Sequence, residues 1–332
     1  MTHAIRIHAN GGPEVMRWEE IELSPLAAGE ARIRHSAIGI NYSDVNVRRG
    51  GFYLAKPQEF PIILGNEAAG VIESVGAGAG GFKPGDRIVY AGMKGEFFQA
   101  SGAYAEARNV PVERLIALPD GVSDRQAAAL MVKGFTASLI INRVFKPKPG
   151  DTILIHTAAS GVGLILCQWA KHLGARVIGT VGSAEKARVA KAHGCDHTIF
   201  YRETDFVAAV KQLAPQGVAA VFDGVGKDTF QASLECIQPF GMAVNYGNAS
   251  GHVPPLDLLL LAKRSLSVSR PGLSTYIRDA ETMRTAAVEL FELVIKGVLK
   301  VEIGKTYALK DAAEAHRDLE ARKSTGSLLL VP

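Results

Sequence analysis

The second half of the chain alternates short apolar strands with helical segments, and this alternation restricts the fold more than any other feature. Strand-like segments lie at residues 151–156, 175–180, 197–200 and 218–223, and helical segments lie at 162–173, 184–192 and 205–213. A further helix–strand pair follows at 229–236 and 241–247. Units of about 25 residues that alternate in this way are typical of parallel sheets with helical crossovers. The pattern predicts a doubly wound parallel sheet.

The first strand of this series is followed by a glycine turn. Residues 155–164 read Ile-His-Thr-Ala-Ala-Ser-Gly-Val-Gly-Leu, between a buried strand and the start of a helix. Gly161 and Gly163 let the backbone approach a pyrophosphate, whose charge the helix N-terminus favours. Ala158 and Ser160 replace the first two glycines of the G-x-G-x-x-G pattern, and small residues also suit tight helix–strand packing. Because the surrounding alternation is the one that a dinucleotide turn requires, we predict nucleotide binding here.

The end of the next strand indicates which nicotinamide cofactor is bound. Sheets that bind NAD usually place an acid there, about 20 residues after the glycines, to bind the ribose 2′-hydroxyl. This chain has Gly182 and Ser183 at that position, with Lys186 one helical turn later. A hydroxyl and a cation suit a 2′-phosphate. Lys186 is otherwise an ordinary solvated helix lysine, and Glu185 is expected to point away from it. The sequence therefore favours NADPH.

The first part of the chain has a different pattern. Strand-like segments at residues 31–40, 70–75, 86–90 and 103–110 are separated by glycine- and proline-rich turns, as in a barrel or sandwich. A helix is predicted at 124–139 and another at 286–297, followed by strands at 301–303 and 327–331. We predict a β-rich catalytic domain over residues 1–125, completed by about 272–332, and a nucleotide-binding domain over 126–271.

Composition excludes several other classes of protein. The chain has 332 residues, of which 47% are hydrophobic, and its 37 basic and 33 acidic residues give a net charge of +4 spread along the sequence. That charge is too dispersed for a nucleic-acid surface. No apolar run approaches the roughly 20 residues that a bilayer requires, and the N-terminus does not resemble a signal peptide. Three scattered cysteines do not make a disulfide framework. We expect a cytoplasmic protein without a membrane or nucleic-acid partner.

A catalytic zinc ion is not expected. Zinc-dependent alcohol dehydrogenases place cysteine and histidine ligands around a Gly-His-Glu segment in their first domain. The matching segment here is Gly65-Asn66-Glu67, with asparagine in place of histidine, and the first 166 residues contain no cysteine.

These features together resemble one family. The chain resembles the NADPH-dependent quinone oxidoreductases of the medium-chain dehydrogenase/reductase superfamily, in the zeta-crystallin-like branch without zinc. The similarity runs nearly end to end and includes Gly-Ile-Asn-Tyr-Ser-Asp at 39–44 and Met-Val-Lys-Gly-Phe-Thr at 131–136. It also covers residues 64–71, 158–163, 179–186, 201–203, 223–226, 246–248, 269–271 and 326–332. The resemblance implies a GroES-like first domain, a Rossmann second domain and a homodimer.

The resemblance also implies a set of site residues. Asn41, Tyr53 and Arg270 would face the substrate, with Asn41 also beside the nicotinamide. The remaining cofactor contacts would be Tyr42, Thr136, Ser160, Gly161, Val162, Gly163, Gly182, Ser183, Lys186, Tyr201, Val225, Tyr246, Gly247, Asn248, Arg322 and Gly326. No metal ligand is implied. Asn46, where relatives often have tyrosine, and an apparent insertion at Gly51 both lie on the substrate side.

The expected reaction is hydride transfer from NADPH to a quinone. Without a metal, charge on the acceptor oxygen must be met by hydrogen-bond donors, and a quinone needs little activation. One alternative is reduction of an activated C=C bond, as in an enal, enone or acrylate, because the same hydride geometry serves both reactions. An alternative from another class is a nucleotide-bound structural or RNA-binding protein, for which the small net charge gives little support.

Overall fold

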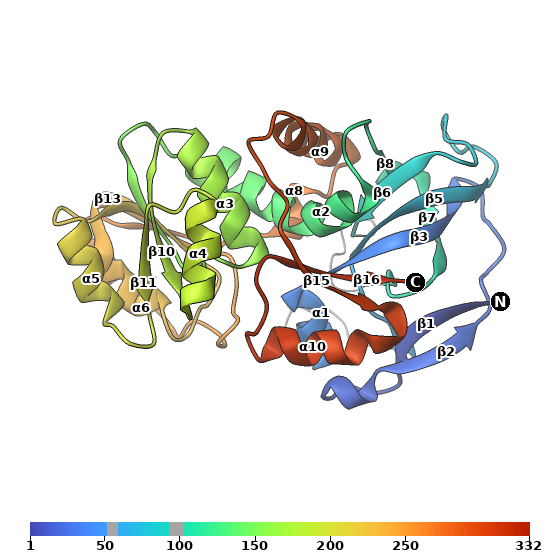
Figure 1. Cartoon of the computed structure of the whole chain (residues 1–332), viewed down its shortest axis with the longest axis horizontal. Coiled ribbons are helices and arrows are strands. Elements are labelled where there is room, and N and C mark those ends of the chain that lie inside the picture. The colour runs from blue at the N-terminus through green and yellow to red at the C-terminus, as the bar shows by residue number, and fades with distance from the viewer. Residues whose placement is uncertain (52–58, 93–101) are drawn as a thin grey trace. The chain divides into compact units, whose positions relative to one another are not determined.

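The computed structural model describes residues 1–51, 59–92 and 102–332. The chain forms two compact units (Figure 1). The first comprises Met1–Phe135, Leu273–Ile295 and Val301–Pro332, and the second comprises Thr136–Gly272 and Lys296–Lys300. Helix α2 (Asp124–Leu139) contains both the predicted boundary at residue 125 and the division after Phe135.

The first unit contains two sheets. The larger has the strand order β15 (Ile303–Ala308), β16 (Ser327–Val331), β3 (Glu30–Ile40), β5 (Glu67–Val75), β6 (Arg87–Ala91) and β8 (Ile116–Ala117), and β7 (Ala107–Pro111) also pairs with β3. The smaller has the order β2 (Arg17–Ile21), β1 (Thr2–Ile7) and β4 (Ile62–Ile63). Because β16 pairs antiparallel with β3, the end of the chain lies in the same sheet as its first hundred residues.

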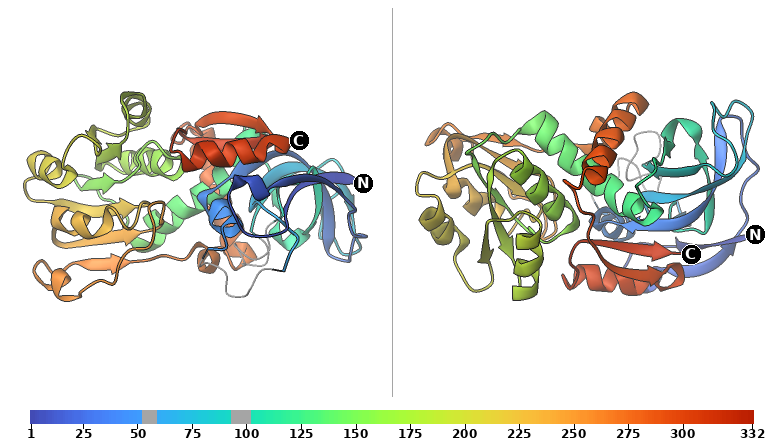
Figure 2. Two further views of the ribbon diagram at one scale, coloured as in Figure 1. Left: turned by 90° about the horizontal axis from the view of Figure 1, so that it is seen from below. Right: turned by 45° about the horizontal axis from the view of Figure 1, so that its top comes forward.

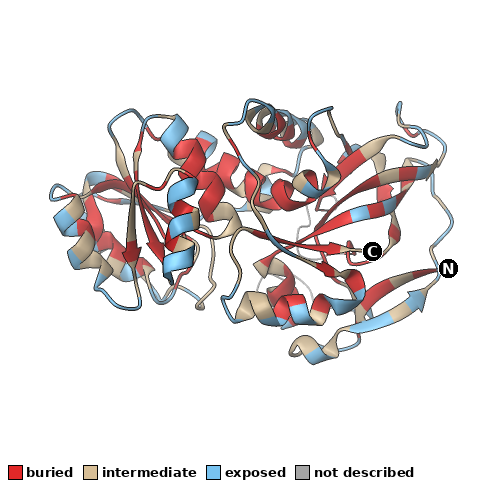
Figure 3. Ribbon diagram, viewed as in Figure 1, coloured by how far each residue is buried: buried red, intermediate tan, exposed pale blue. Residues whose placement is uncertain are grey.

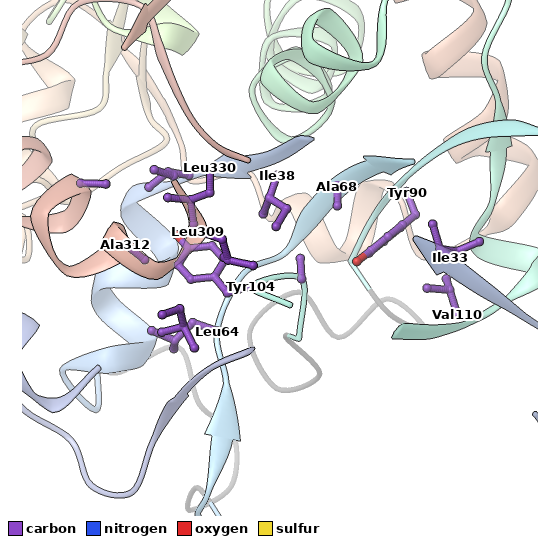
Figure 4. Close-up of a cluster of buried hydrophobic side chains, with 14 of the residues drawn as sticks. Ile33, Ile38, Leu64, Ala68, Tyr90, Tyr104, Val110, Leu309, Ala312 and Leu330 are labelled. Carbon is purple, nitrogen blue, oxygen red and sulfur yellow. The ribbon is translucent and has the colours of Figure 1, made fainter. Parts of the chain in front are cut away.

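The core of the first unit is built from alternate residues of these strands and from the C-terminal helix (Figure 4). Ile33 and Ile38 of β3, Tyr90 of β6 and Leu330 of β16 are fully buried in it. The hydroxyl of Tyr90 lies 3.0 Å from Nε2 of His35, whose Nδ1 lies 2.7 Å from the carbonyl oxygen of Ala105. Burial lowers the pKa of His35 to about 4, so this histidine is neutral and belongs to the core.

The helices of the first unit are α1 (Tyr42–Arg48), α8 (Leu273–Tyr276), α9 (Ala280–Ile295) and α10 (Ala312–Glu320), with short 3-10 turns at Pro13–Val15, Val112–Arg114 and Leu309–Asp311. Helix α2 continues into a π-helical turn, Ile140–Val144. Of the described residues, only this combined helix, Asp124–Val144, has the length and composition of a membrane span. Its most apolar window is 78% buried inside the protein, as in the core helix of a globular protein.

The second unit is a six-stranded, all-parallel sheet. Its order is β11 (His197–Phe200), β10 (Arg176–Val181), β9 (Thr152–Ile155), β12 (Val218–Asp223), β13 (Ile237–Asn245) and β14 (Ser267–Ser269). Helices α3 (Gly161–His172), α4 (Ala184–Ala192), α5 (Phe206–Leu213), α6 (Phe230–Ser233) and α7 (Leu259–Ala262) connect the strands, with a 3-10 turn at Leu234–Cys236. Figure 2 shows the same helices flanking the strands in two other views.

This strand order is the 3-2-1-4-5-6 order of dinucleotide-binding sheets. The prediction of a doubly wound parallel sheet is therefore confirmed. The central strands β9, β10 and β12 are almost entirely buried, while the edge strand β14 is partly exposed and the helices expose their outer faces (Figure 3). In such sheets ligands bind at the carboxyl ends of the strands, where the order reverses, which here is between β9 and β12.

Some predicted elements have different limits in the structure. The strand predicted at 301–303 begins at Ile303 and runs to Ala308, because Lys305 to Ala308 pair with β16. The helix predicted at 286–297 begins earlier, at Ala280, and ends at Ile295. Strands β1 and β2 and helices α1 and α10 were not predicted.

Candidate functional site

The turn from β9 into α3 has the geometry of a phosphate-binding turn. Thr157 adopts a left-handed conformation with φ of 55°, and Ser160 caps α3, its Oγ accepting a hydrogen bond from the backbone N–H of Gly163 at 3.1 Å. A methyl group added at Gly163 would collide with the carbonyl oxygen of Thr157. Only glycine fits there, so the turn comes close to the helix start and leaves the first N–H groups of α3 at the strand end.

The buried residue His156 holds this turn in place through hydrogen bonds. Ser233 Oγ donates to the carbonyl of Thr229, so it accepts from His156 Nε2 at 2.8 Å. His156 Nδ1 is therefore an acceptor, and it lies 3.1 Å from Thr180 Oγ1, which itself accepts from the N–H of Thr157 at 3.2 Å. Burial lowers the pKa of His156, which agrees with the neutral ring that this chain of hydrogen bonds requires.

The end of β10 brings together four of the predicted residues. Ser183 caps α4 and accepts a hydrogen bond from the N–H of Lys186 at 3.3 Å. A methyl group added at Gly182 would lie 3.2 Å from the hydroxyl of Tyr201, so these two residues are neighbours. Ser183 is exposed and Lys186 is half-buried. Arg202, which the sequence reasoning did not select, lies 5.8 Å over the ring of Tyr201 and adds a second cation.

The ends of β12 and β13 bring together five more predicted residues around Asp223. Its Oδ1 accepts from the N–H groups of Val225 at 2.6 Å and Gly226 at 3.1 Å, and its Oδ2 from Thr229. The backbone N–H of Tyr246 donates to the carbonyl of Asp223, and the side chain of Asn245 donates to the carbonyl of Gly247. Arg270 donates to the carbonyl of Asn245 at 3.0 Å, and Asn248 packs against Gly226.

In the first unit Asn41 lies in a buried polar cluster at the start of α1. Its Nδ2 donates to Glu67 Oε1 at 2.8 Å, and its Oδ1 accepts from Lys133 Nζ at 3.0 Å. The Asn41 backbone N–H donates to Asp44 Oδ2 at 2.8 Å. Burial raises the pKa of Asp44 to about 7. The sequence reasoning selected Asn41 but neither of its charged partners.

The other predicted residues are more widely spread. Tyr42 is the first residue of α1, and Thr136 lies in the part of α2 that belongs to the second unit. Arg322 and Gly326, both left-handed, lie on the connection between α10 and β16. Tyr53 lies outside the described residues.

No group of three histidine, cysteine, aspartate or glutamate side chains in the described ranges is arranged to hold a metal ion. Asn66, at the position of the zinc-ligand histidine, donates from its Nδ2 to Asp44 Oδ1 at 2.7 Å. That side chain is therefore committed to a neighbouring carboxylate.

Two family models match the chain. The alcohol dehydrogenase GroES-like domain matches residues 27–120, and the zinc-binding dehydrogenase model matches residues 161–292. With the parallel sheet and its glycine turn, these matches define the class as a medium-chain dehydrogenase/reductase, and they confirm the predicted fold.

Individual relatives are similar over their full length. The quinone oxidoreductase of Salmonella typhimurium is 44% identical and quinone oxidoreductase 1 of Escherichia coli is 43% identical, each with all of both chains covered. The crystal structure of Escherichia coli quinone oxidoreductase complexed with NADPH matches with a TM-score of 0.93 at 42% identity, covering 99% of this chain and all of that one. The chain belongs to the quinone oxidoreductase family.

A relative with a different activity is nearly as similar. The 2-haloacrylate reductase of a Burkholderia species is 40% identical over all of this chain and 99% of its own length. Fold and overall identity alone therefore do not separate quinone reduction from the reduction of an activated alkene.

Proposed function

We propose that this protein is an NADPH-dependent quinone oxidoreductase that transfers hydride from NADPH to a quinone without zinc. The observation that carries the proposal is the end of β10, where Gly182, Ser183, Lys186 and Tyr201 gather and no carboxylate stands at the strand terminus. A hydroxyl cap and a cation at this position suit a 2′-phosphate, whereas NAD sites usually have an acid. The relative in Escherichia coli whose structure contains NADPH supports the same choice.

The residues present fit the cofactor. The missing side chain at Gly163 lets the backbone of Thr157 and Ala158 pack against the start of α3, and a pyrophosphate would be held by residues 160–163 at the N-terminus of that helix. The 2′-phosphate contacts are Gly182, Ser183, Lys186 and Tyr201. The further contacts that we propose are Asn41, Tyr42, Thr136, Val225, Tyr246, Gly247, Asn248, Arg322 and Gly326.

Bound NADPH supplies the hydride, and the protein orients the two reactants. We assign Asn41, Tyr53 and Arg270 as the donors that meet the charge developing on the acceptor oxygen. Donors of this kind replace a metal ion as the electrostatic catalyst. Extended dialysis against a chelator is accordingly expected to leave turnover unchanged.

The test is NADPH or NADH oxidation, followed at 340 nm with 1,4-benzoquinone, 9,10-phenanthrenequinone and a 2-alkenal. We expect rapid loss of NADPH with a quinone and little loss of NADH. Lys186→Ala should raise the KM for NADPH by about 10- to 100-fold, since it removes a charge-assisted hydrogen bond. Lys191→Ala, on the exposed end of the same helix, is the matched control. Equal use of NADPH and NADH by the unmodified protein would refute the cofactor assignment.

The second candidate function is reduction of an activated C=C bond. The similarity to the 2-haloacrylate reductase favours it specifically, because that relative also matches end to end. The relative turnover of the quinone and the 2-alkenal, when both are present, decides between quinone reduction and alkene reduction. Faster turnover of the alkenal would keep the cofactor site and move the acceptor to an alkene.

We propose that the protein is a homodimer through the edge of the second unit's sheet. Strand β14 is the outermost strand, and an unpaired strand edge is a template for a second chain. Four large apolar side chains are exposed in this part of the chain, namely Phe240, Leu258, Leu259 and Val268. Exposed apolar residues next to a sheet edge are typical of a subunit interface.

A cytoplasmic location is part of the same proposal. Cys167, Cys195 and Cys236 are all buried free thiols, and burial raises the pKa of the Cys236 thiol to about 12. Unpaired thiols are typical of reducing compartments.

A further inference from the structure

Glu67 of β5 and Lys133 of α2 form a buried ion pair in the first unit. Lys133 Nζ lies 3.1 Å from Glu67 Oε1, and the two side chains are 8% and 0% exposed. Removing two charges from water can cost more than their attraction returns, so a buried pair is weak evidence for stability. The pair therefore calls for a function other than holding β5 against α2.

The surroundings of Glu67 are built to hold its carboxylate in one place. Oε1 accepts from Lys133 Nζ and Asn41 Nδ2, and Oε2 accepts from the backbone N–H of Val132 at 2.7 Å. On β3, a methyl group added at Gly39 would collide with Glu67 Oε1. Glycine at residue 39 therefore leaves the room that this carboxylate occupies.

The ion pair determines how the Asn41 amide is oriented. A lysine ammonium only donates hydrogen bonds and a carboxylate only accepts them. Oδ1 of Asn41 must therefore face Lys133, and Nδ2 must face Glu67, at 3.0 Å and 2.8 Å. Flipping the amide would set two donors against each other and two acceptors against each other. An asparagine without such neighbours has no comparable preference.

We infer that Lys133, acting with Glu67, is a positioning residue that makes Asn41 present an N–H group to an oxygen atom of the bound reactants. The amide has two N–H donors, and Glu67 takes one of them. The second has no partner among the described residues and is the donor that Asn41 offers. The oxygen belongs either to the nicotinamide ribose or to the acceptor. This inference rests on the proposed role of Asn41.

The inference is tested with Lys133→Met, which keeps the length of the side chain and removes the charge. We expect kcat/KM to fall by about 10- to 100-fold, the usual cost of a displaced catalytic contact. A fall in kcat with unchanged NADPH affinity assigns the oxygen to the acceptor, and a weaker NADPH affinity assigns it to the ribose. Lys310→Met, at an exposed lysine of the same unit, is the control and should match the unmodified protein.

A double-mutant cycle separates positioning from a structural role. If Lys133 acts through Asn41, then Asn41→Ala/Lys133→Met should be no slower than Asn41→Ala alone, because the two effects share one interaction. If the fold-losses of kcat/KM in the two single variants multiply in the double variant, the inference is overturned. A kcat/KM of Lys133→Met within twofold of the unmodified value would overturn it as well.

Lys133→Met leaves the buried Glu67 carboxylate without its cation, which destabilises the folded state. The double variant Glu67→Gln/Lys133→Met leaves no unpaired buried charge and therefore separates loss of stability from loss of positioning. Its melting midpoint should be close to that of the unmodified protein while its kcat/KM stays reduced, because an amide at residue 67 no longer dictates the Asn41 orientation. Full activity in this folded variant would refute the positioning role.

The experiments distinguish failure of this inference from failure of the proposed function. If the unmodified protein reduces no quinone, that function is wrong, and NADPH fluorescence titration then tests the inference alone. A rise in the NADPH dissociation constant for Lys133→Met, but not for Lys310→Met, would support it. An unchanged dissociation constant would exclude the ribose oxygen, and turnover of the 2-alkenal then tests the acceptor oxygen. A kcat/KM of Lys133→Met for the alkenal within twofold of the unmodified value would overturn the inference.

Discussion

At the residue scale, Asp44 makes the stability of the protein depend on pH. Its carboxylate is fully buried among Asn41, Asn66 and Tyr104, and desolvation raises its pKa from 3.8 to about 7. The folded state therefore binds more protons than the unfolded state between these values. The contribution of Asp44 is fully present below about pH 4 and is lost as the pH rises through 7.

Asp44→Asn should remove this dependence. We expect the variant to gain about 2–4 kcal/mol relative to the original protein on going from pH 4 to pH 8. Asn66 Oδ1, which has no partner among the described residues, becomes available to the new amide if Asn66 rotates. Urea unfolding at several pH values measures the difference, with Asp120→Asn at an exposed site as the control. Parallel stability curves for Asp44→Asn and the original protein would contradict the assignment.

Asn41 could be predicted as a site residue, and its partners could not. Asn41 belongs to the Gly-Ile-Asn-Tyr-Ser-Asp motif, whereas Lys133 and Glu67 lie in motifs that carried the family resemblance without indicating a role. Their pairing joins residues 66 positions apart in the chain. Such a contact depends on how α2 packs on β5, which no local pattern of the sequence encodes.

At the element scale, two serine caps give matched predictions. Ser160 caps α3 through Gly163 and Ser183 caps α4 through Lys186, at 3.1 Å and 3.3 Å. Replacing either by alanine should lower the free energy of unfolding by about 1 kcal/mol. Ser160→Ala should weaken NADPH and NADH alike, since both carry the pyrophosphate. Ser183→Ala should weaken NADPH alone.

Thermal unfolding and fluorescence titration with each cofactor check both variants. Each variant is the control for the other, because the loss of a helix cap is common to both. Equal weakening of NADPH and NADH binding by Ser183→Ala would show that α4 does not face the 2′-phosphate.

The helices that could be predicted are those with both a long apolar period and an end signal. Helix α4 runs from Ala184 to Ala192 as predicted, with Ser183 before it and Gly194 after it. Helix α1 has only seven residues, too few for a clear period, and its start is set by the cap at Asn41. Strand β15 contains Gly304 and Lys305 and is held by its partner β16, so its limits were set by pairing.

At the scale of the whole molecule, the parallel sheet could be predicted because each of its crossovers is local. Each strand and its helix follow one another directly, from β9 to β13. The two sheets of the first unit depend on long-range pairs, such as β16 with β3 and β4 with β1. Pairing between distant strands leaves little trace in the sequence of either strand.

The free edge of the parallel sheet carries exposed apolar side chains. Val268 lies on β14, and Phe240 is 83% exposed on the neighbouring strand β13. Apolar side chains at a strand edge lose solvent-exposed area when a second copy docks, and charges there oppose docking. We therefore expect Phe240→Lys/Val268→Lys, which adds charges of one sign, to convert a dimer into a monomer of 35.3 kDa.

Sedimentation equilibrium at micromolar concentration measures the mass directly. Val288→Lys replaces a valine that is 54% exposed on α9 of the first unit, so it adds a lysine away from the edge and should leave the dimer intact. The NADPH affinity of the monomeric variant should be unchanged, since neither Phe240 nor Val268 is among the proposed cofactor contacts and the phosphate contacts lie at the ends of β9 and β10. An unmodified protein that sediments at 35.3 kDa would refute the dimer, and a double variant that stays dimeric would place the interface elsewhere.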